Sequence, residues 1–238
     1  MAQPTIIATE STVYTPVADS GTNKEFTEVD IPATANTIFL MFTNDSPEST
    51  RTISSFVFDN ATIQNTLLHT IDVSSATLAK NTQIKIYDTR DLGAFSNEDV
   101  TVVLSSGTST KSLLGVVCTD GYLESFSAAD NMTANVFQLS AYSANFNNNI
   151  LLQMASLDGD VTSFSYTTGT EVYKTTSSGS ISLVAGKQAT NASGIKTIAG
   201  SKSGDDLSSV SILISSQPNP YADIDPRGDI ISHDIITN

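Results

Sequence analysis

The residues that could do chemistry in this chain are two histidines, one cysteine and a few closely spaced aspartates. His69 and His233 have no Cys or carboxylate at metal-ligand spacing, apart from Asp234 beside His233. A Ser-His-Asp triad would need one of these histidines in a cleft, and the sequence contains no G-x-S-x-G nucleophile motif. We therefore expect a protein that is not an enzyme and needs no cofactor, with both histidines structural or solvent-exposed.

Two groups of aspartates bring carboxylates close together, as calcium-binding loops do. One is Asp158-Gly-Asp160, and the other comprises Asp223, Asp225 and Asp229. Neither group has the spacing of an EF-hand loop, so turn residues or solvated faces explain them better than a metal site. The second group also contains an Arg-Gly-Asp tripeptide of the integrin-binding type, which equally suits a turn after a proline.

The charge balance excludes some classes of partner. Lys and Arg number 11 and Asp and Glu number 25, which gives a formal net charge of −14 and a pI near 4.2. A surface this negative opposes binding to nucleic-acid phosphates and to anionic lipid. Charged residues make up only 15% of the chain, and Ser, Thr and Asn take their place. This composition is typical of proteins in assemblies or outside cells, although many ordinary β-sandwiches share it.

The cysteine usage and the N-terminus indicate where the protein is made. Cys118 is the single cysteine and lies in an apolar run, so we expect a small buried hydrophobe. The first residues lack the basic segment and apolar stretch of a secretory signal. No stretch approaches the roughly 18 apolar residues of a membrane span. We expect synthesis in a cytosol, and release only by lysis or as part of a particle.

The segment 99–122 is the strongest fold signal. Two apolar runs, 100–104 and 113–118, flank a polar Gly-containing turn, and both are too apolar to leave one face in water. They are predicted to pair as the two central strands of a hairpin. Gly115 interrupts the second run, which indicates a bulge or a close backbone approach, and we expect the strand to bend there.

Short strands account for most of the remaining chain. They are predicted at 26–31, 37–42, 51–59, 66–73, 81–88, 136–139, 150–154, 161–166, 171–175, 180–185, 194–199 and 208–215. The polar segment 123–134 is predicted as a loop, and no helical period persists for three turns. About a dozen short strands without helical crossovers favour an all-β, antiparallel two-sheet sandwich. Among such sandwiches, a jelly roll fits the pattern best.

Three segments follow from this pattern. Residues 1–22 are predicted as an extended arm or an edge strand, 23–216 as one sandwich, and 217–238 as an extended tail. Three prolines keep the tail extended, and its apolar residues offer something to bury against a neighbouring subunit. The residues predicted to contact a partner are Pro220, Tyr221, Ile224, Ile230, Ile231, Ile235 and Ile236.

The order of the stretches 37–42, VTVVLSS, LLGVVCTDGY, ILLQMASLDGD and SSVSILISS resembles sandwich modules in virion proteins of tailed phages, including tail fibres and capsid decoration proteins. The resemblance covers approximately 25–216 and is one of pattern. It implies a structural virion protein, most suitably a capsid decoration or cement subunit or else a tail or fibre component. Such a protein would form a homo-oligomer, contact other virion proteins, and lock neighbours through its terminal arms.

Similar modules in carbohydrate-binding and bacterial surface proteins leave a second function open. The chain could be a lectin-like module that binds a surface glycan, with Tyr122 and Tyr142 as candidate contacts. The absence of Trp and the aromatic content of 7% weigh against this alternative, because sugar rings are usually held on aromatic faces.

Overall fold

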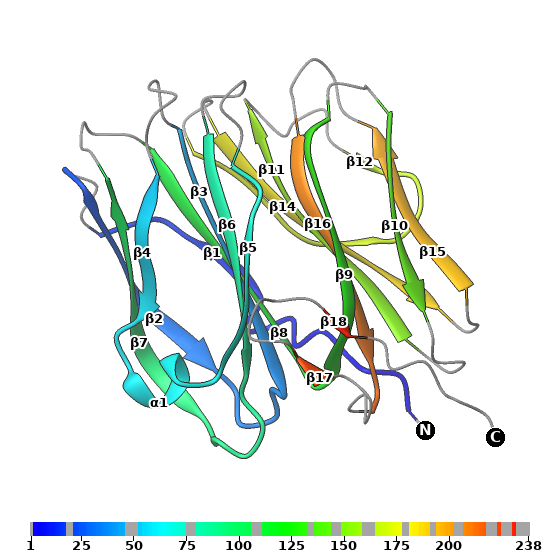
Figure 1. Ribbon diagram of the computed structural model, residues 1–238, viewed down its shortest axis with the longest axis horizontal. Coiled ribbons are helices and arrows are strands. Elements are labelled where there is room, and N and C mark those ends of the chain that lie inside the picture. The colour runs from blue at the N-terminus through cyan, green and yellow to red at the C-terminus, as the bar shows by residue number, and fades with distance from the viewer. Residues whose placement is uncertain are drawn as a thin grey trace.

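The computed structural model describes residues 2–17, 21–45, 52–74, 80–105, 111–132, 136–143, 149–158, 165–177, 181–190, 194–201, 207–217, 223–224 and 230–231. These residues form antiparallel sheets with one helical turn, which confirms the all-β, antiparallel prediction. The prediction of two sheets gave too few layers, because four sheets are stacked face to face across Figure 1. We number them sheets 1 to 4 in stacking order, from left to right in that view.

Sheets 1 and 2 are built from the first eight strands. Sheet 1 has the order β2 (Asn23–Ile31), β7 (Phe95–Leu104), β4 (Ile53–Phe58). Sheet 2 has the order β1 (Thr12–Tyr14), β8 (Ser112–Thr119), β3 (Thr37–Asp45), β6 (Lys80–Asp88), β5 (Leu67–Asp72). The single turn α1 (Ala61–Gln64) follows β4, and the Asn60 side chain caps it by accepting from the backbone N–H of Thr62 at 2.9 Å.

Sheets 3 and 4 are built from the next eight strands. Sheet 3 has the order β13 (Thr170–Ser177), β14 (Ile181–Thr190), β11 (Asn149–Asp158), β16 (Leu207–Ser215), β9 (Tyr122–Met132). Sheet 4 has the order β10 (Val136–Ser143), β15 (Gly194–Ser201), β12 (Ser165–Tyr166). The short strands β17 (Asp223–Ile224) and β18 (Ile230–Ile231) of the tail pair with each other.

One topology occurs twice in this chain. Sheet 2 runs β1-β8-β3-β6-β5, and sheet 3, read from its other edge, runs β9-β16-β11-β14-β13. Sheet 1 runs β2-β7-β4, and sheet 4 runs β10-β15-β12. Adding eight to each strand number of the first set therefore gives the second set. The segment 23–216, predicted as one sandwich, contains both sets apart from β1, and the short link Asp120–Gly121 joins them.

The two sets meet through sheets 2 and 3, whose strand orders run in opposite directions. Strand β1 contacts β13, and β8 contacts β14. At the centre, the hydroxyls of Thr43 on β3 and Ser156 on β11 lie 2.8 Å apart. At the other edge, the rings of His69 on β5 and Phe126 on β9 pack with centroids 5.2 Å apart. This is the arrangement of an isologous, two-fold dimer interface, built here within one chain.

Double-sided burial explains the long apolar runs. On β3, Phe39 and Met41 belong to the core between sheets 2 and 3, whereas Ile38, Leu40 and Phe42 belong to the core between sheets 1 and 2. All five are fully buried. Successive side chains of a strand point to opposite faces, so a strand covered on both faces reads as continuously apolar.

The core between sheets 1 and 2 is rich in aromatic contacts. Phe42 makes edge-to-face contacts with Phe26 on one side and Phe56 on the other, at centroid distances of 6.1 and 6.0 Å. Phe58 packs in the same way on Tyr87 at 5.2 Å. Each such pair contributes about 0.5–1.5 kcal/mol beyond its buried area, so sheet 1 is held firmly on sheet 2.

The hairpin prediction for 100–104 and 113–118 was wrong in its pairing. Strand β7 lies in sheet 1 between β2 and β4, whereas β8 lies in sheet 2 between β1 and β3. The chain crosses from one layer to the next, so Val102 and Val116 share one core instead of one ladder. Of these two strands, β8 is buried along its whole length, whereas β7 alternates half-buried and buried residues only from Asp99 to Leu104. Both strands are central in their own sheets, as predicted.

Of the two readings of Gly115, the close approach is correct and the bulge is wrong, while the predicted bend of the strand stays a prediction. The pairing of β8 with β3 runs from Thr37↔Thr119 to Asn44↔Ser112 without a register shift. A Cβ on Gly115 would lie 2.2 Å from the Tyr173 hydroxyl of sheet 3, so only glycine fits. The same arrangement recurs between sheets 3 and 4, where a Cβ on Gly186 would meet the Tyr166 ring at 2.3 Å.

The remaining strand predictions were correct except in one segment. The predicted strands 26–31, 37–42, 51–59, 66–73 and 81–88 correspond to β2 to β6, and those from 136 onward correspond to β10 to β16. Of 161–166, only β12 falls within the described residues. The predicted loop 123–134 is instead mostly strand β9, which forms the edge of sheet 3 and carries two register shifts. Its polar residues suit an edge strand, which a purely apolar criterion overlooks.

The N-terminal segment takes the edge-strand alternative. Strand β1 pairs with β8, and the Ile7 N–H donates to the Cys118 carbonyl at 2.9 Å. Gln3 reaches the second set of strands, where its Nε2 donates to the Asn149 carbonyl at 3.0 Å. Residues before β1 therefore bind both halves of their own chain. The extended-arm form of this prediction is not what residues 2–17 adopt.

Candidate functional site

A pocket of about 390 Å³ lies where β6 leaves sheet 2 and where the chain enters β5 from α1. Its lining combines charged, amide, hydroxyl and aliphatic side chains. The lining residues are Asn65, Thr66, Leu67, Leu68, Asp88, Arg90 and Asp91. Two connections that are distant in sequence thus meet, and the Asp88 N–H fixes them together by donating to the Thr66 carbonyl at 3.0 Å.

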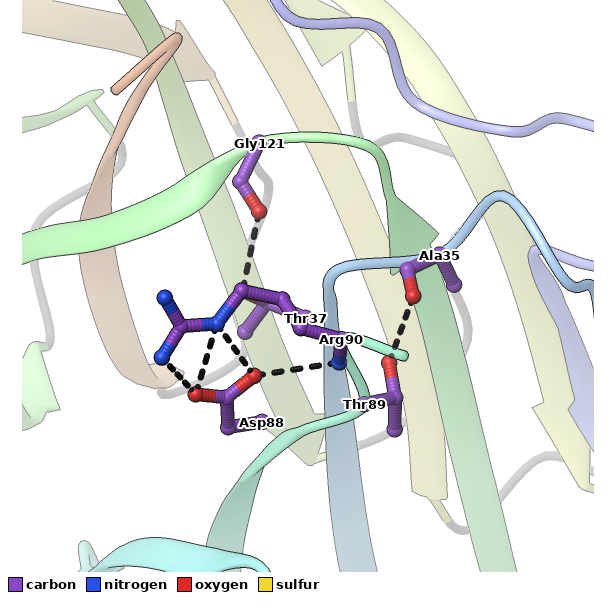
Figure 2. A network of polar contacts seen from close by, with 6 residues as sticks. All are labelled: Ala35, Thr37, Asp88, Thr89, Arg90 and Gly121. Atoms are coloured by element: carbon purple, nitrogen blue, oxygen red, sulfur yellow. Dashed lines mark hydrogen bonds and ion pairs between the residues drawn. The ribbon is translucent and has the colours of Figure 1, made fainter. Parts of the chain in front are cut away.

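Arg90, a charged side chain of this pocket, contacts both Asp88 and Tyr122. Its Nε donates to both carboxylate oxygens of Asp88 at 2.9 Å, and its Nη2 donates to Oδ2, as Figure 2 shows. The other side of the guanidinium lies 5.3 Å from the centre of the Tyr122 ring. Hydrogen bonding to Asp88 is the main reason that the pKa of Arg90 is raised. The guanidinium is therefore a fixed positive charge held between a carboxylate and a π face.

The turn that carries Arg90 is tied to the start of β3. The Thr89 N–H donates to the Asn36 carbonyl at 2.9 Å. The Thr89 hydroxyl donates to the Ala35 carbonyl, also at 2.9 Å (Figure 2). Asp91 then adopts a left-handed backbone with φ of 63°. Aspartate tolerates this region better than most residues, which allows the chain to reverse direction here.

The link between the two strand sets lies beside this turn. The Thr37 hydroxyl donates to the Gly121 carbonyl at 2.9 Å, and the Gly121 N–H donates to the Thr119 hydroxyl at 3.0 Å. Asp120 accepts from the Thr5 hydroxyl through Oδ2 at 2.8 Å. A Cβ on Gly121 would lie 2.3 Å from Ile214 Cγ2, so the link passes tightly against sheet 3. Because Tyr122 follows directly, Arg90 bridges the first set of strands to the second.

The chemistry available here is recognition by hydrogen bonding. Asp88 is engaged by Arg90, whereas Asn65 and Asp91 are exposed polar groups on the same pocket. A donor and acceptor set of this kind, with two leucines beside it, suits a neutral hydroxylated ligand. Within the described ranges, no group of three or more His, Cys, Asp or Glu side chains is placed to hold a metal ion.

The residues singled out from the sequence do not form one site among the described residues. His69 is buried against Phe126, and desolvation by burial lowers its pKa. Cys118 is fully buried, as predicted, and burial raises the pKa of its thiol to about 12. Asp158 ends β11. Several positions lie outside the described residues: Asp160, Asp225, Arg227, Asp229, His233 and Asp234.

The predicted partner contacts fall in the tail. Ile224 lies in β17, and Ile230 and Ile231 lie in β18, with Ile224 directly opposite Ile230. Pro220, Tyr221, Ile235 and Ile236 lie outside the described residues. Contact between these residues and a partner stays a prediction. Of the two candidate glycan contacts, Tyr122 lies beside the pocket with one ring face over Arg90, and Tyr142 belongs to β10.

Sequence reasoning did not find Arg90. The signal was present as Asp88-Thr-Arg-Asp91, a concentration of charge in a chain with few charged residues. The partners Asn65 and Tyr122 come from distant segments, so the local sequence could not have indicated the pocket.

Comparisons of this chain with known protein families, with curated proteins and with solved structures found no match. Among the described residues, no helix has the length and apolar character needed to cross a membrane.

Proposed function

We propose that this chain is a non-enzymatic structural protein of a bacteriophage virion, made in the host cytoplasm. Its place would be a capsid decoration or cement subunit, or else a tail or fibre component. The observation that carries the proposal is the four-layer stack, in which the two central sheets are covered on both faces. Such a block has two outer sheets, strand edges and loops with which to contact neighbours, which suits a load-bearing spacer.

The strand order supports the predicted jelly-roll character. An eight-stranded jelly roll can be described as a long hairpin wrapped into two sheets, in which the first strand pairs with the eighth, the second with the seventh and the third with the sixth. Here β1 pairs with β8, β2 with β7 and β3 with β6. The remaining pair of such a roll, β4 with β5, is replaced, because β5 joins β6 and β4 joins β7.

The second set of strands supports the same description. Strands β10 and β15 pair, as do β11 and β14, while β9 and β16 close the set. We therefore propose two jelly rolls in tandem, each with its fifth strand moved to the larger sheet. In the proposed virion role, the two similar halves of one chain would offer neighbouring subunits two similar outer sheets.

The tail would supply the contacts with other subunits or with other virion proteins. Residues 219–238 would not offset their ordering entropy alone, at about 1–2 kcal/mol per residue, without a partner surface. Addition of tail strands to an exposed sheet edge would provide backbone hydrogen bonds and pockets for isoleucines.

Deletion of residues 219–238 tests this role. The truncated protein should keep its thermal stability and its monomer fold but fail to assemble or to bind particles. A double variant, Ile230→Ser with Ile231→Ser, should weaken particle binding, whereas Thr237→Ala serves as a matched control in the same tail. Normal assembly of the truncated protein, or loss of its fold, would contradict the proposed role of the tail.

The pocket favours a second candidate function, a lectin-like module that binds a host-surface glycan. The supporting observation is the fixed Arg90 beside Asn65 and Asp91, which together offer donors and acceptors to sugar hydroxyls. A glycan array should then show saturable binding that weakens in Asn65→Ala and Asp91→Ala. Glu25→Ala, an exposed residue of β2 outside the pocket, is the control. An array without binding, with and without calcium, leaves the structural proposal alone.

A further inference from the structure

Several polar side-chain atoms between sheets 3 and 4 are buried without a hydrogen-bond partner among the described residues. Gln153 is fully buried, and neither its Nε2 nor its Oε1 has a partner. The hydroxyls of Ser209 and Ser211 are in the same state, and so is Oε1 of Gln188. Burying a polar group without a hydrogen bond is unfavourable, so native proteins satisfy nearly all of them with protein or with ordered water.

These atoms gather around Gln153 on one face of sheet 3. Gln153 on β11 lies directly opposite Ser211 on β16 and opposite Gly186 on β14. Ser209 is two residues along from Ser211, and Gln188 is two residues along from Gly186, so all share that face. The neighbouring residues Leu152 and Met154 point the other way, into the core with sheet 2.

Sheet 4 covers this face. The ring of Tyr166 on β12 packs directly over Gly186, and β15 contacts both β11 and β14. Gln153 therefore lies in an enclosed layer, with a serine hydroxyl on one side and an aromatic ring over glycine on the other. Gln153 and Ser211 are direct cross-strand neighbours, yet no hydrogen bond joins their side chains. Polar neighbours that do not bond each other directly can be joined by a bridging water.

The first half of the chain provides an internal comparison. The equivalent layer, between sheets 1 and 2, is faced by Ile38, Leu40 and Phe42 from β3, the counterpart of β11. The layer between sheets 2 and 3 shows that a buried hydroxyl in this fold can be satisfied directly, because Thr43 bonds both Ser156 and Thr82. Unpartnered buried hydroxyls occur in the other layers as well, at Ser112, Ser208 and Tyr173. What distinguishes the layer under sheet 4 is that several such atoms gather around one fully buried amide, that of Gln153.

We infer that the layer between sheets 3 and 4 contains a bound-water site centred on Gln153, in which ordered water bridges the Gln153 amide to the hydroxyls of Ser209 and Ser211. Such a water makes two to four hydrogen bonds, which this set of donors and acceptors supplies. Sheet 4 is then attached to the stack through a hydrated layer, whereas sheet 1 is attached through an apolar and aromatic one.

Oxygen-17 relaxation dispersion of water on the full chain tests this site, because it counts internal waters with long residence times. The native protein should show such waters, and Gln153→Leu should lose at least one of them. Ser211→Ala removes a single hydroxyl and should give a smaller loss in the same direction if the leucine variant folds poorly. The matched control is Ser156→Ala, on the opposite face of the same strand, where Thr43 and Thr82 remain bonded to each other.

A loss in the Gln153 and Ser211 variants, with no change in Ser156→Ala, supports the site. The inference is overturned if Ser211→Ala and Ser156→Ala retain the same number of long-lived waters as the native protein. It is also overturned if a high-resolution crystal structure places a protein donor or acceptor on each Gln153 amide atom.

Discussion

Replacing Gly115 by alanine should loosen the contact between the two halves of the chain. The new Cβ would lie 2.2 Å from the Tyr173 hydroxyl oxygen and 2.9 Å from Cζ, both far inside van der Waals contact. Gly115 does not occupy the left-handed backbone region, so crowding is the whole cost. Overpacking a buried site costs about 1–3 kcal/mol, and the corresponding fall in Tm is about 2–12 °C for a chain of this size.

A double-mutant cycle identifies the cause of that loss. The Tyr173 hydroxyl is buried and makes no hydrogen bond with any described residue, so Tyr173→Phe alone should be neutral or slightly stabilising. In that background the oxygen nearest to the new Cβ is gone, and Gly115→Ala should cost less. Urea and thermal unfolding of the four proteins measure the coupling. An equal cost in both backgrounds, or an alanine variant with native Tm, would refute the proposed contact.

Three further predictions follow from the layers. Val116→Asp places an unpaired charge in the fully buried core between sheets 1 and 2, at a cost of several kcal/mol. The variant should therefore be insoluble or unfolded by circular dichroism. The control, Thr70→Asp at an exposed position of β5, should melt normally. Burial lowers the pKa of His69, so below pH about 6.5 the unfolded chain takes up a proton that the folded chain does not. In urea titrations at decreasing pH, the stability of the native protein should therefore fall more steeply than that of His69→Leu. An equal pH dependence of stability in the two proteins would contradict this prediction. Native-state hydrogen exchange should show weaker protection of β10 and β15 in sheet 4 than of β2 and β7 in sheet 1, and equal protection would argue against a hydrated layer.

The sequence was most informative where one strand is buried on both faces. The run 37–42 is continuously apolar because β3 lies between two cores, and the all-β class followed from such runs. It was least informative about how many layers there are. On β16, Ser209 and Ser211 alternate with Val210 and Ile212, a pattern that normally indicates one solvent face, although here the serine face is covered by sheet 4.

Pairing and repetition could not be predicted for a related reason. Apolar runs that flank a turn are compatible with a hairpin or with a crossing between two layers, and the choice depends on the partners β2, β4, β1 and β3. The repetition is one of strand order, which depends on pairing between distant segments and is not encoded by local sequence patterns. The pocket depends on contacts of Arg90 with Asp88, which is local, and with Tyr122, which is not.

The most direct test of the proposed virion role is electron cryomicroscopy of purified virions whose genome encodes this chain. The proposal predicts regularly repeated density on the capsid, tail or fibre into which the four-layer stack fits, with the C-terminal tail in contact with a neighbouring subunit. Purified virions that lack this protein, by both mass spectrometry and density, would contradict it.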